Sequence, residues 1–367
     1  MPMARTSWAW IRAAQAAEPG APDPEAPGSA NRAGRSADPA EFLRSAESLK
    51  RFSRRRFLAG SALGLTLAAD LFVTRRIQRH REDLEILRVR DEAVERRFPT
   101  ASWFLFPGYK TSWEETVWIL NSLRPALSSR GQLAGVGYSN RGLDVDDIVA
   151  AVYRHIRTHQ LRRIYFYGHS FGGMLAVQVA ARLLERGIAV ELIILDSSPA
   201  GAQDVLDRAM FEGVAALYDA GYRIPSVLRG GYELGERVLH KDERTWNTVV
   251  DQTLEQLSPL APSSTLIQSE ASYIFHFDAW RFASALGSTS LAFIGNPEDR
   301  TVNYFGAKDT WAAVFPRNLV SASLVTEGAG PAHASPQWNP GIYQKVVREV
   351  LRLHSPPEQG GGLKSLF

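Results

Sequence analysis

The chain contains no cysteine among its 367 residues. This absence excludes a disulfide-stabilised scaffold, a zinc site with cysteine ligands, an iron–sulfur cluster and a thiol nucleophile. It favours no redox compartment, because a protein without cysteine suits the cytosol and the cell exterior equally. Apolar residues make up 45% of the chain and charged residues 22%, which is ordinary for a globular protein and excludes a wholly disordered or fibrous one.

A large excess of charge of either sign is also missing, since the formal net charge is only +3. Residues 1–97 carry 18 Lys and Arg against 13 Asp and Glu, whereas residues 98–367 carry 24 against 26. The positive balance therefore belongs to the first quarter of the chain, and nothing in the main body indicates a nucleic-acid groove. We expect no nucleic-acid partner.

The first 50 residues have little of what a packed core needs. Ala, Pro, Gly, Ser and Arg dominate residues 1–40, and such a segment buries too little apolar surface to offset the entropy of ordering. We predict a disordered extension over residues 1–50. The alternative is that the true start of the protein lies downstream.

An arginine-rich motif, SRRRFL at residues 53–58, leads into an apolar run over residues 57–73. This order resembles a twin-arginine export signal. As a helix the run spans about 25 Å, slightly less than the ~30 Å hydrocarbon core of a bilayer. Residues 51–74 are therefore predicted to be a signal or a short membrane anchor, and the protein to be membrane-associated or exported. The alternatives are an apolar helix packed on the main domain and a cytoplasmic location.

Charged residues dominate positions 75–97, with Ile77, Leu84, Leu87 and Val94 at rough helical spacing. This pattern indicates a solvated amphipathic helix that links the export segment to the main domain. Residues 355–367 are expected to form a flexible tail.

From residue 101 onward, short apolar runs alternate with amphipathic helical patterns. Such alternation predicts right-handed crossovers and a mostly parallel sheet covered by helices, an α/β fold, over residues 98–354. The expected strands are Ser102–Phe106, Leu133–Val136, Arg163–Tyr167, Val190–Leu195, Leu291–Ile294 and Ser323–Val325. The expected helices between them include Trp113–Ser128, Val145–Thr158, Gly172–Arg186 and Pro340–His354.

The stretch from Ser197 to Ser290 interrupts this alternation. An insertion of about 90 residues is too long for a simple connection. We predict a helical cap at about residues 197–289, over the active-site edge of the sheet. Its expected helices are Ala202–Ala220, Ile224–Leu239, Arg244–Gln256 and Leu266–Ala285.

A strand pattern runs through Gly168-His169-Ser170-Phe171-Gly172 into a helix pattern. In such a G-x-S-x-G turn the serine hydroxyl is exposed above the sheet, and the flanking glycines are needed because side chains there would clash. The helix directs the positive end of its dipole toward the site, which favours developing negative charge. We therefore predict that Ser170 is a nucleophile.

With this motif in its context, residues 101–354 resemble the α/β-hydrolase superfamily. Gly168–Pro199 is locally similar to the thioesterases of polyketide and non-ribosomal peptide synthesis. The resemblance implies that a histidine after the last strand is the base, which is His333 in GAGPAHASP, residues 328–336. The usual first two strands of the family are hard to find. Either the sheet is trimmed at that edge or residues 75–97 supply part of it.

Two carboxylates are candidates for the acid that orients His333. Asp299 lies in a G-x-x-x-D-x-x-V loop at residues 295–302, the commoner family pattern. Asp196 ends the strand that follows the G-x-S-x-G turn at residues 168–172, which we call the elbow. Synthase-type thioesterases often place their acid at the end of this strand. We favour Asp299. Five other histidines are weaker candidates for the base: His155, His159, His169, His240 and His276.

The reaction also needs two backbone N–H donors for an oxyanion. By resemblance one is the amide of Phe171, directly after the nucleophile. The other comes from the loop after the first clear strand, where Pro107-Gly108 replaces the His-Gly of many relatives. By position this second donor is the amide of Tyr109, a role that the replacement leaves intact because no side chain is involved.

These residues indicate acyl transfer through a covalent acyl-serine. The expected activity is hydrolysis of a small-molecule ester or thioester with an apolar acyl group; the alternatives are an acyltransferase with the same triad and a non-catalytic ligand-binding member of the fold. No P-loop, H-E-x-x-H or dinucleotide-binding motif appears, so we expect no cofactor and no metal. Any membrane contact would be made by the N-terminal segment. The apolar acyl group is suggested by aromatic residues of the cap, although packing onto the sheet accounts for most of them: Phe211, Tyr218, Tyr222, Tyr273, Phe275, Phe277 and Trp280.

Overall fold

The computed structural model describes residues 81–206, 208–221 and 262–354. All of them belong to the larger of two compact units, Thr66–Phe367. The predicted N-terminal extension and signal or anchor segment lie outside the described residues, as do the C-terminal tail and the expected cap helices Ile224–Leu239 and Arg244–Gln256. Within the described part of the chain, no helix is long and apolar enough to span a membrane.

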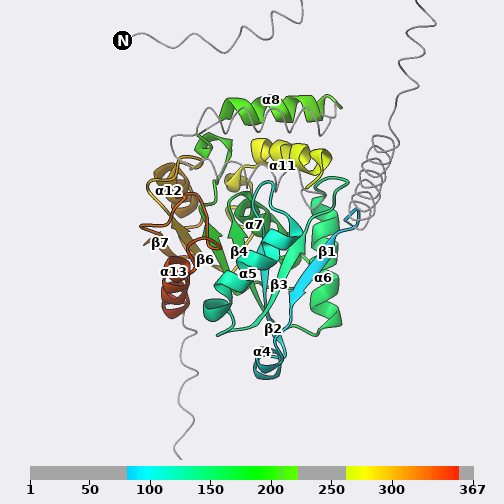
Figure 1. Ribbon diagram of the computed structural model, residues 1–367, viewed down its shortest axis with the longest axis vertical. Helices are drawn as coiled ribbons and strands as arrows, with labels where there is room; N and C mark the ends of the chain where they lie inside the picture. The colour runs from blue at the N-terminus through cyan, green and yellow to red at the C-terminus, as the bar shows by residue number, and fades with distance from the viewer. Residues whose placement is uncertain (1–80, 207, 222–261, 355–367) are drawn as a thin grey trace, which may run out of the picture. The chain divides into compact units, whose positions relative to one another are not determined.

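Among the described residues, a seven-stranded sheet forms the centre of this unit, which confirms the predicted mostly parallel α/β fold (Figure 1). The order is β1-β3-β2-β4-β5-β6-β7, and each neighbouring pair is parallel except β1 with β3. The strands are β1 (Glu85–Val89), β2 (Ala101–Phe106), β3 (Gln132–Gly137), β4 (Arg163–His169), β5 (Leu192–Asp196), β6 (Ser290–Gly295) and β7 (Leu319–Val325).

The helices outside the cap are α4 (Glu92–Arg97), α5 (Trp113–Leu127), α6 (Val145–Thr158), α7 (Phe171–Leu184), α12 (Tyr304–Val314) and α13 (Pro340–Leu353). Several begin at a side-chain cap that satisfies free backbone amides of the first turn. Asp144 accepts hydrogen bonds from two amides at the start of α6, and Ser112 accepts one from the amide of Glu115 at the start of α5. The sequence pattern did not predict α12, whose first turn is capped by Asn303.

Alternate residues along the central strands face two separate apolar layers. Phe104 and Phe166 pack in one layer with α6, α7 and α12. Trp103 and Tyr165 pack in the other with α5 and α13. Each residue of β2 is buried, as expected of a parallel strand covered on both faces. The period-2 alternation of the strands thus builds two cores, one on each side of the sheet.

The linker helix expected over residues 75–97 is not formed at Glu85–Val89. This segment forms an antiparallel edge strand, paired with β3 from Glu85 opposite Gly137 to Val89 opposite Leu133. The helical prediction is therefore wrong here and holds within the described residues only for Glu92–Arg97. Apolar side chains of the strand pack on both cores, Ile86 on one and Val89 on the other. The edge of the sheet is thus supplied from this segment.

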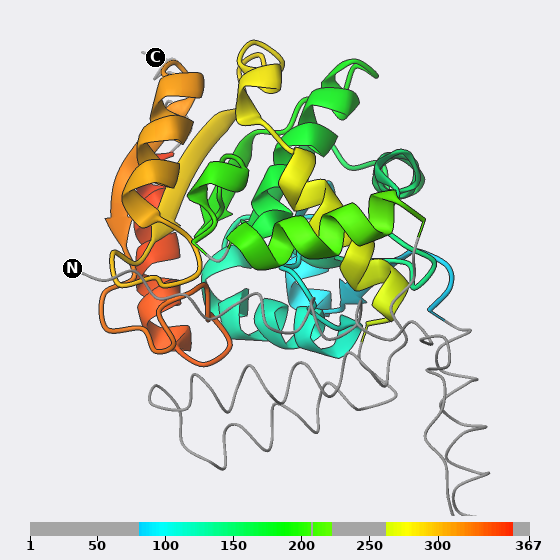
Figure 2. The same cartoon turned by 90° about the horizontal axis from the view of Figure 1, so that it is seen from above.

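The described part of the cap contains η1 (Ala202–Asp204), α8 (Arg208–Asp219), α11 (Ser264–His276) and η3 (Ala279–Phe282). Two helices, α8 and α11, lie side by side (Figure 2). The expected helix Ala202–Ala220 is broken because Val205 forms a β-bridge with Val302, in the loop between β6 and α12. The expected helix Leu266–Ala285 also breaks, because Phe277 is extended and Asp278 caps a new short helix.

Candidate active site

Ser170 stands at the sharp turn between β4 and α7. Its backbone has φ 53° and ψ −126°, a left-handed conformation that L-residues rarely adopt and that marks stored strain. A Cβ on Gly168 would lie 2.3 Å from the Cα of Gly173, and one on Gly172 would lie 2.1 Å from the carbonyl oxygen of Phe106. Both glycines are therefore required by close backbone approach, as the motif predicts.

His333 bridges Ser170 and Asp299. Its Nε2 lies 2.9 Å from the Oγ of Ser170, and its Nδ1 lies 2.7 Å from Oδ2 of Asp299. The other carboxylate oxygen of Asp299 accepts hydrogen bonds from the amides of Thr301 and Val302, at 2.8 and 3.0 Å. The loops after β6 and β7 thus converge on the turn after β4, and three residues far apart in sequence form one hydrogen-bonded line.

Electrostatics favour a protonated imidazole at His333. Burial lowers its pKa, but the charge and hydrogen bond of Asp299, with the charge of Asp196, raise it above the ordinary value of 6.5. A cation that forms at His333 during a proton transfer is thereby stabilised. The neighbouring His169 behaves in the opposite way, because burial and the charge of His333 lower its pKa to about 4.

Asp196, the alternative acid, does not contact His333 by a hydrogen bond. Its Oδ2 accepts a hydrogen bond of 2.8 Å from the Tyr167 hydroxyl, and its Oδ1 is buried without a partner among the described residues. Burial raises the pKa of Asp196 to about 7. Its backbone supports the elbow, since its carbonyl oxygen accepts the amide of Ser170 at 2.8 Å. The structure therefore pairs His333 with Asp299.

The loop after β2, residues 107–110, lies against the elbow. A Cβ on Gly108 would lie 3.0 Å from Nδ1 of His169, so glycine permits the close approach. Tyr109 and Phe171, the two expected amide donors, both line the pocket that holds Ser170. Two residues that belong to no sequence motif hold this loop in place. The hydroxyl of Tyr138 donates a hydrogen bond to the carbonyl oxygen of Pro107 at 3.2 Å. The side chain of Glu270 accepts a hydrogen bond from the backbone amide of Lys110 at 3.1 Å.

The other described histidines have different surroundings from the one at the site. His155 lies in the last turn of α6 and stacks on His159, the residue that follows the helix. His159 also contacts Arg88 of the edge strand β1. His276 contacts Asp219 of α8 at 2.9 Å. The Nε2 of His169 lies 2.5 Å from the carbonyl oxygen of Ala334, beside His333. His240 lies outside the described residues.

A pocket of about 290 Å³ opens over Ser170 and His333. Its wall is mixed: Lys110 and Glu115 are charged, whereas Trp338 is an aromatic side chain that is 53% exposed. The indole of Trp338 packs edge-to-face on that of Trp118, with 4.8 Å between ring centroids. The apolar side of the pocket is formed by Phe171, Pro199, Val205, Ile274 and Val302.

Aromatic residues of the cap do not supply this wall in the described part of the chain. Tyr273 packs on Phe171 and donates its hydroxyl to Gln178 at 2.7 Å. Phe277 packs on Phe282 and Trp311. These rings join the cap to the sheet domain, so the packing interpretation of the cap aromatics is the one that holds for them.

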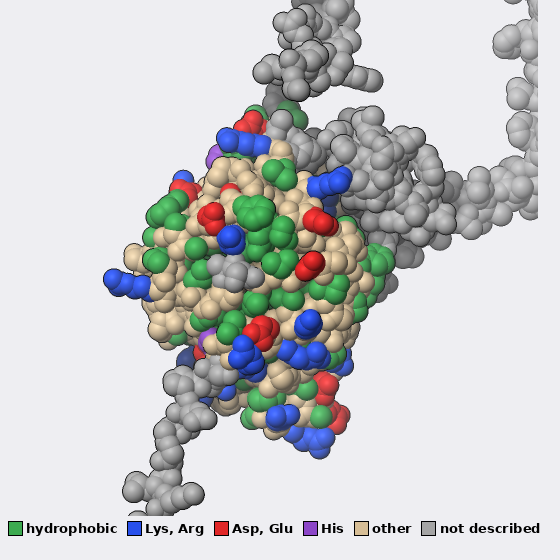
Figure 3. All heavy atoms as spheres, turned by 90° about the vertical axis from the view of Figure 1, so that its left-hand side faces the viewer, with side chains coloured by type: hydrophobic (Ala, Val, Ile, Leu, Met, Phe, Trp, Pro, Cys, Tyr) green, Lys and Arg blue, Asp and Glu red, His purple; other side chains and the backbone are tan. Residues whose placement is uncertain are grey.

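Large apolar side chains are also exposed after η1, on η3 and on α12: Leu206, Trp280 and Phe305. Figure 3 looks onto the face that carries α12, β7 and α13, where apolar side chains gather among separate acidic and basic ones. The charged groups are mixed in sign, so this face has no single electrostatic character.

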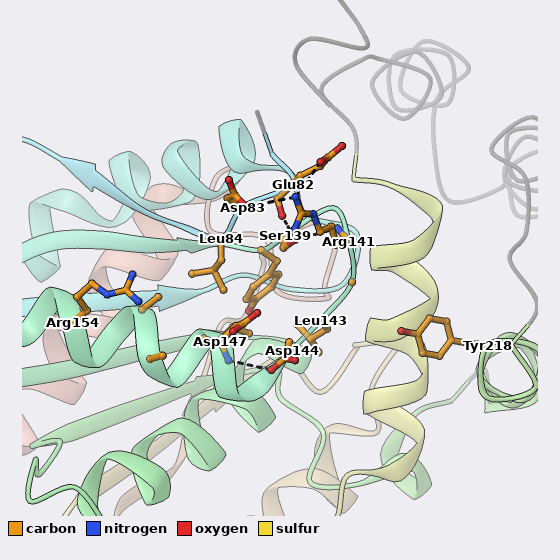
Figure 4. Close-up of a pocket in the computed structure, with 15 residues that line it drawn as sticks. Glu82, Asp83, Leu84, Ser139, Arg141, Leu143, Asp144, Asp147, Arg154 and Tyr218 are labelled. Atoms are coloured by element: carbon orange, nitrogen blue, oxygen red, sulfur yellow. Dashed lines mark hydrogen bonds and ion pairs between the residues drawn. The ribbon is translucent and has the colours of Figure 1, made fainter. Parts of the chain in front are cut away.

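A second pocket, of about 410 Å³, lies between the β1 edge, the start of α6 and α8 (Figure 4). Its lining is polar, and Arg141 within it forms ion pairs with Glu82 and Asp83. Asp144 and Asp147 lie at the start of α6, where Asp144 is already engaged as the cap. Among the described residues, no group of three or more acidic or histidine side chains is arranged to hold a metal ion.

Comparisons with known proteins agree with this architecture. The model of the thioesterase domain family matches residues 115–229. Among solved structures, the chain is similar to a lipase-esterase related protein from Clostridium acetobutylicum, at 12% identity and a TM-score of 0.51, over 74% of this chain and 99% of that one. An enol-lactonase from Burkholderia xenovorans gives 15% identity and a TM-score of 0.51, over 73% and 95%. No curated protein matches the sequence.

At these sequence identities, the similarity to solved structures shows the fold. The match to the thioesterase family includes the elbow and Gly168–Pro199, the segment that resembles thioesterases in sequence. The chain therefore has the α/β-hydrolase fold, and its residues 115–229 are similar to the thioesterase domain family.

Proposed function

We propose that the protein hydrolyses an ester or thioester of an apolar acyl group through an acyl-enzyme on Ser170. The observation that carries the proposal is the line from Ser170 through His333 to Asp299, with distances of 2.9 and 2.7 Å. A serine hydroxyl is a weak nucleophile until a positioned base takes its proton, and the base needs an acid to orient it and to stabilise its charge.

In the acylation step, Nε2 of His333 takes the proton from Ser170 as Oγ attacks the carbonyl carbon of the substrate. The negative charge that forms on the carbonyl oxygen is stabilised by the amides of Phe171 and Tyr109. The tetrahedral intermediate collapses, and His333 returns the proton to the departing alcohol or thiol. Asp299 orients the imidazole and stabilises the imidazolium, consistent with the raised pKa of His333.

Deacylation repeats these steps with water as the nucleophile. His333 takes a proton from water, hydroxide adds to the acyl carbon, and Ser170 leaves with the proton that His333 returns. An acyltransferase would differ only in using an alcohol or amine in place of water. Product analysis with and without an added alcohol separates the two activities.

The pocket supports an apolar acyl group of limited size. Val205, Ile274 and Val302 form an aliphatic wall beside Ser170 in a volume of about 290 Å³, and each buried methylene contributes about 0.8 kcal/mol to binding. A series of acyl esters and acyl thioesters of increasing chain length tests this proposal. We expect kcat/KM to rise with chain length and then to fall once the pocket is filled; a flat series would contradict it.

Reaction with a fluorophosphonate probe tests the nucleophile. We expect the wild-type protein to be labelled at Ser170, and Ser170→Ala to lose both labelling and hydrolysis of acyl esters. Ser122→Ala is the matched control, since this serine lies on α5 and its hydroxyl bonds only the carbonyl of Trp118 among the described contacts. If folded wild-type protein is not labelled, and Ser170→Ala matches it on a panel of esters, the enzyme is not a serine hydrolase.

Residues 53–73 support a proposal about location. We propose that this segment exports the protein or holds it at a membrane, because its motif resembles a twin-arginine signal. Replacing Arg54 and Arg55 with lysine should shift the protein toward the soluble cytosolic fraction. An unchanged soluble distribution for both forms would refute the signal.

A further inference from the structure

Glu270 is a fully buried acid in the middle of α11, with 0% of its surface exposed. Its Oε2 accepts the amide of Lys110 at 3.1 Å, and its Oε1 is buried with no hydrogen-bond partner among the described residues. Burying a carboxyl group with so few partners costs free energy. An apolar residue would serve α11 better if the helix needed only to pack, so the acid calls for another explanation.

The residue that Glu270 holds directly follows Tyr109, the expected oxyanion donor. Lys110 has a φ of 62°, in the left-handed region that a side chain other than glycine adopts only when its surroundings enforce it. At the other end of the same loop, the Tyr138 hydroxyl donates to the carbonyl of Pro107 at 3.2 Å. The loop is therefore fixed at both ends, once from the sheet and once from the cap.

We propose that Glu270 is a positioning residue that holds the Tyr109 amide in place for the oxyanion and thereby couples helix α11 of the cap to catalysis. The proposal rests on the acyl-serine function proposed above. Donors to an oxyanion act only when they are fixed in advance at the point where charge develops. Without the bond from Glu270, the strained peptide of Lys110 loses its acceptor, and the preceding amide loses its fixed direction.

The charged and titratable groups around Glu270 predict how its action depends on pH. Burial raises the pKa of Glu270 to about 8, against the opposing effects of the Lys110 amide and the Lys110 charge. Tyr138 faces it from the end of β3, and Tyr273 lies on the same helix; burial raises the pKa of both phenols well above the ordinary value. Asp219 of α8 is a further charged group facing α11, where its carboxylate forms hydrogen bonds with Ser272 and His276.

Near pH 7 Glu270 therefore carries a proton, and its carbonyl oxygen can accept the amide without placing a negative charge behind the oxyanion loop. Ionisation above about pH 8 would add a charge that opposes the oxyanion. Glutamine is the neutral mimic, because it keeps an acceptor oxygen and cannot ionise. Leucine keeps the volume and removes the acceptor.

The test compares Glu270→Gln, Glu270→Leu and the wild-type full-length protein in hydrolysis of an acyl ester, with Gln268→Leu as the matched control. Gln268 is also buried on α11, and its amide has no hydrogen-bond partner among the described residues. We expect Glu270→Leu to lower kcat roughly tenfold to a hundredfold with little change in KM, because loss of one whole oxyanion donor costs about 10²–10³ in kcat. Gln268→Leu should stay close to wild type.

The pH profile separates positioning from a merely structural role. We expect the kcat of the wild type to decline above pH 8. Glu270→Gln should keep kcat within about threefold of the wild type at pH 7 and should not show that decline. The inference is overturned if Glu270→Gln keeps that decline, or if Glu270→Leu folds and keeps full kcat. If the wild type neither reacts with the fluorophosphonate probe nor hydrolyses esters, the proposed function fails and this inference with it. If Glu270→Leu does not fold, the pH–rate profile of Glu270→Gln by itself tests the proposed positioning role.

Discussion

Asparagine in place of Asp196 should change the pH dependence of folding stability. In the wild type, burial raises the pKa of Asp196 from 3.8 to about 7. The folded state therefore holds a proton that the unfolded state releases over this range, and the carboxyl group destabilises the fold increasingly as pH rises above 3.8. Asparagine carries no titrating proton at that position, so the variant escapes this penalty.

The magnitude follows from linkage between proton binding and folding. Each pH unit between the unfolded and folded pKa values costs about 1.4 kcal/mol, so a shift of about 3 units costs roughly 4 kcal/mol once the pH exceeds about 7. Between pH 5 and pH 8, the free energy of unfolding of Asp196→Asn should rise relative to that of the wild type by roughly 2–3 kcal/mol.

A constant offset accompanies this change and does not affect the test. The amide oxygen can accept the Tyr167 hydroxyl as Asp196 does now, but the amide nitrogen takes the place of an oxygen that has no partner among the described residues. An unpaired buried donor costs about 1–3 kcal/mol at every pH. The slope of the stability difference with pH is therefore the quantity to read.

Urea unfolding at pH 5, 6, 7 and 8 measures this difference by linear extrapolation. Asp309→Asn controls for the loss of one carboxylate, since that side chain is 74% exposed on α12. The reasoning is refuted if the difference between Asp196→Asn and the wild type stays constant over this range, or if the control gives the same slope. Esterase activity should largely survive in Asp196→Asn, because this side chain makes no hydrogen bond to His333.

Two further predictions concern the site and its turn. Asp299→Asn should lower kcat/KM by a factor on the order of 10⁴ and move the acidic limb of the pH–rate profile to lower pH, because the charge of Asp299 raises the pKa of His333; near-full activity would show that another group is the acid. Gly172→Ala should abolish labelling of the nucleophile and lower the melting temperature, since its Cβ would lie 2.1 Å from the Phe106 carbonyl oxygen. Gly213→Ala, in α8 with nothing within 4 Å of its Cβ, should instead stabilise the fold by about 0.5–1 kcal/mol, and equal effects of the two changes would contradict the steric argument.

Features that depend on neighbours along the chain can be predicted from sequence alone. The strand at residues 163–169, its turn and α7 follow from an apolar run, from glycines at fixed offsets and from helical periodicity. The bounds of α6, Val145–Thr158, follow from its capping aspartate and its apolar stripe. These signals are local because backbone sterics and side-chain caps act within a few residues.

Elsewhere the local signals were ambiguous. Glu85–Val89 has a pattern that fits a charged helix as well as an edge strand, and pairing with β3 decided in favour of the strand. The cap aromatics Tyr273 and Phe277 have the composition of an acyl pocket, yet they pack on the sheet domain. Composition cannot say which side of a helix faces a substrate, because that depends on what the helix packs against.

By itself, the sequence determined the α/β alternation, the place of Ser170 in a strained turn, and the short set of residues that could serve it. Only the tertiary structure decided between Asp299 and Asp196, because the contact with His333 depends on where the loops after β6 and β7 converge. The same holds for Glu270, 160 positions from Lys110 in the chain. The hydrogen bond between Glu270 and Lys110 forms because the cap lies over the loop that follows β2. No local sequence pattern predicts this long-range contact.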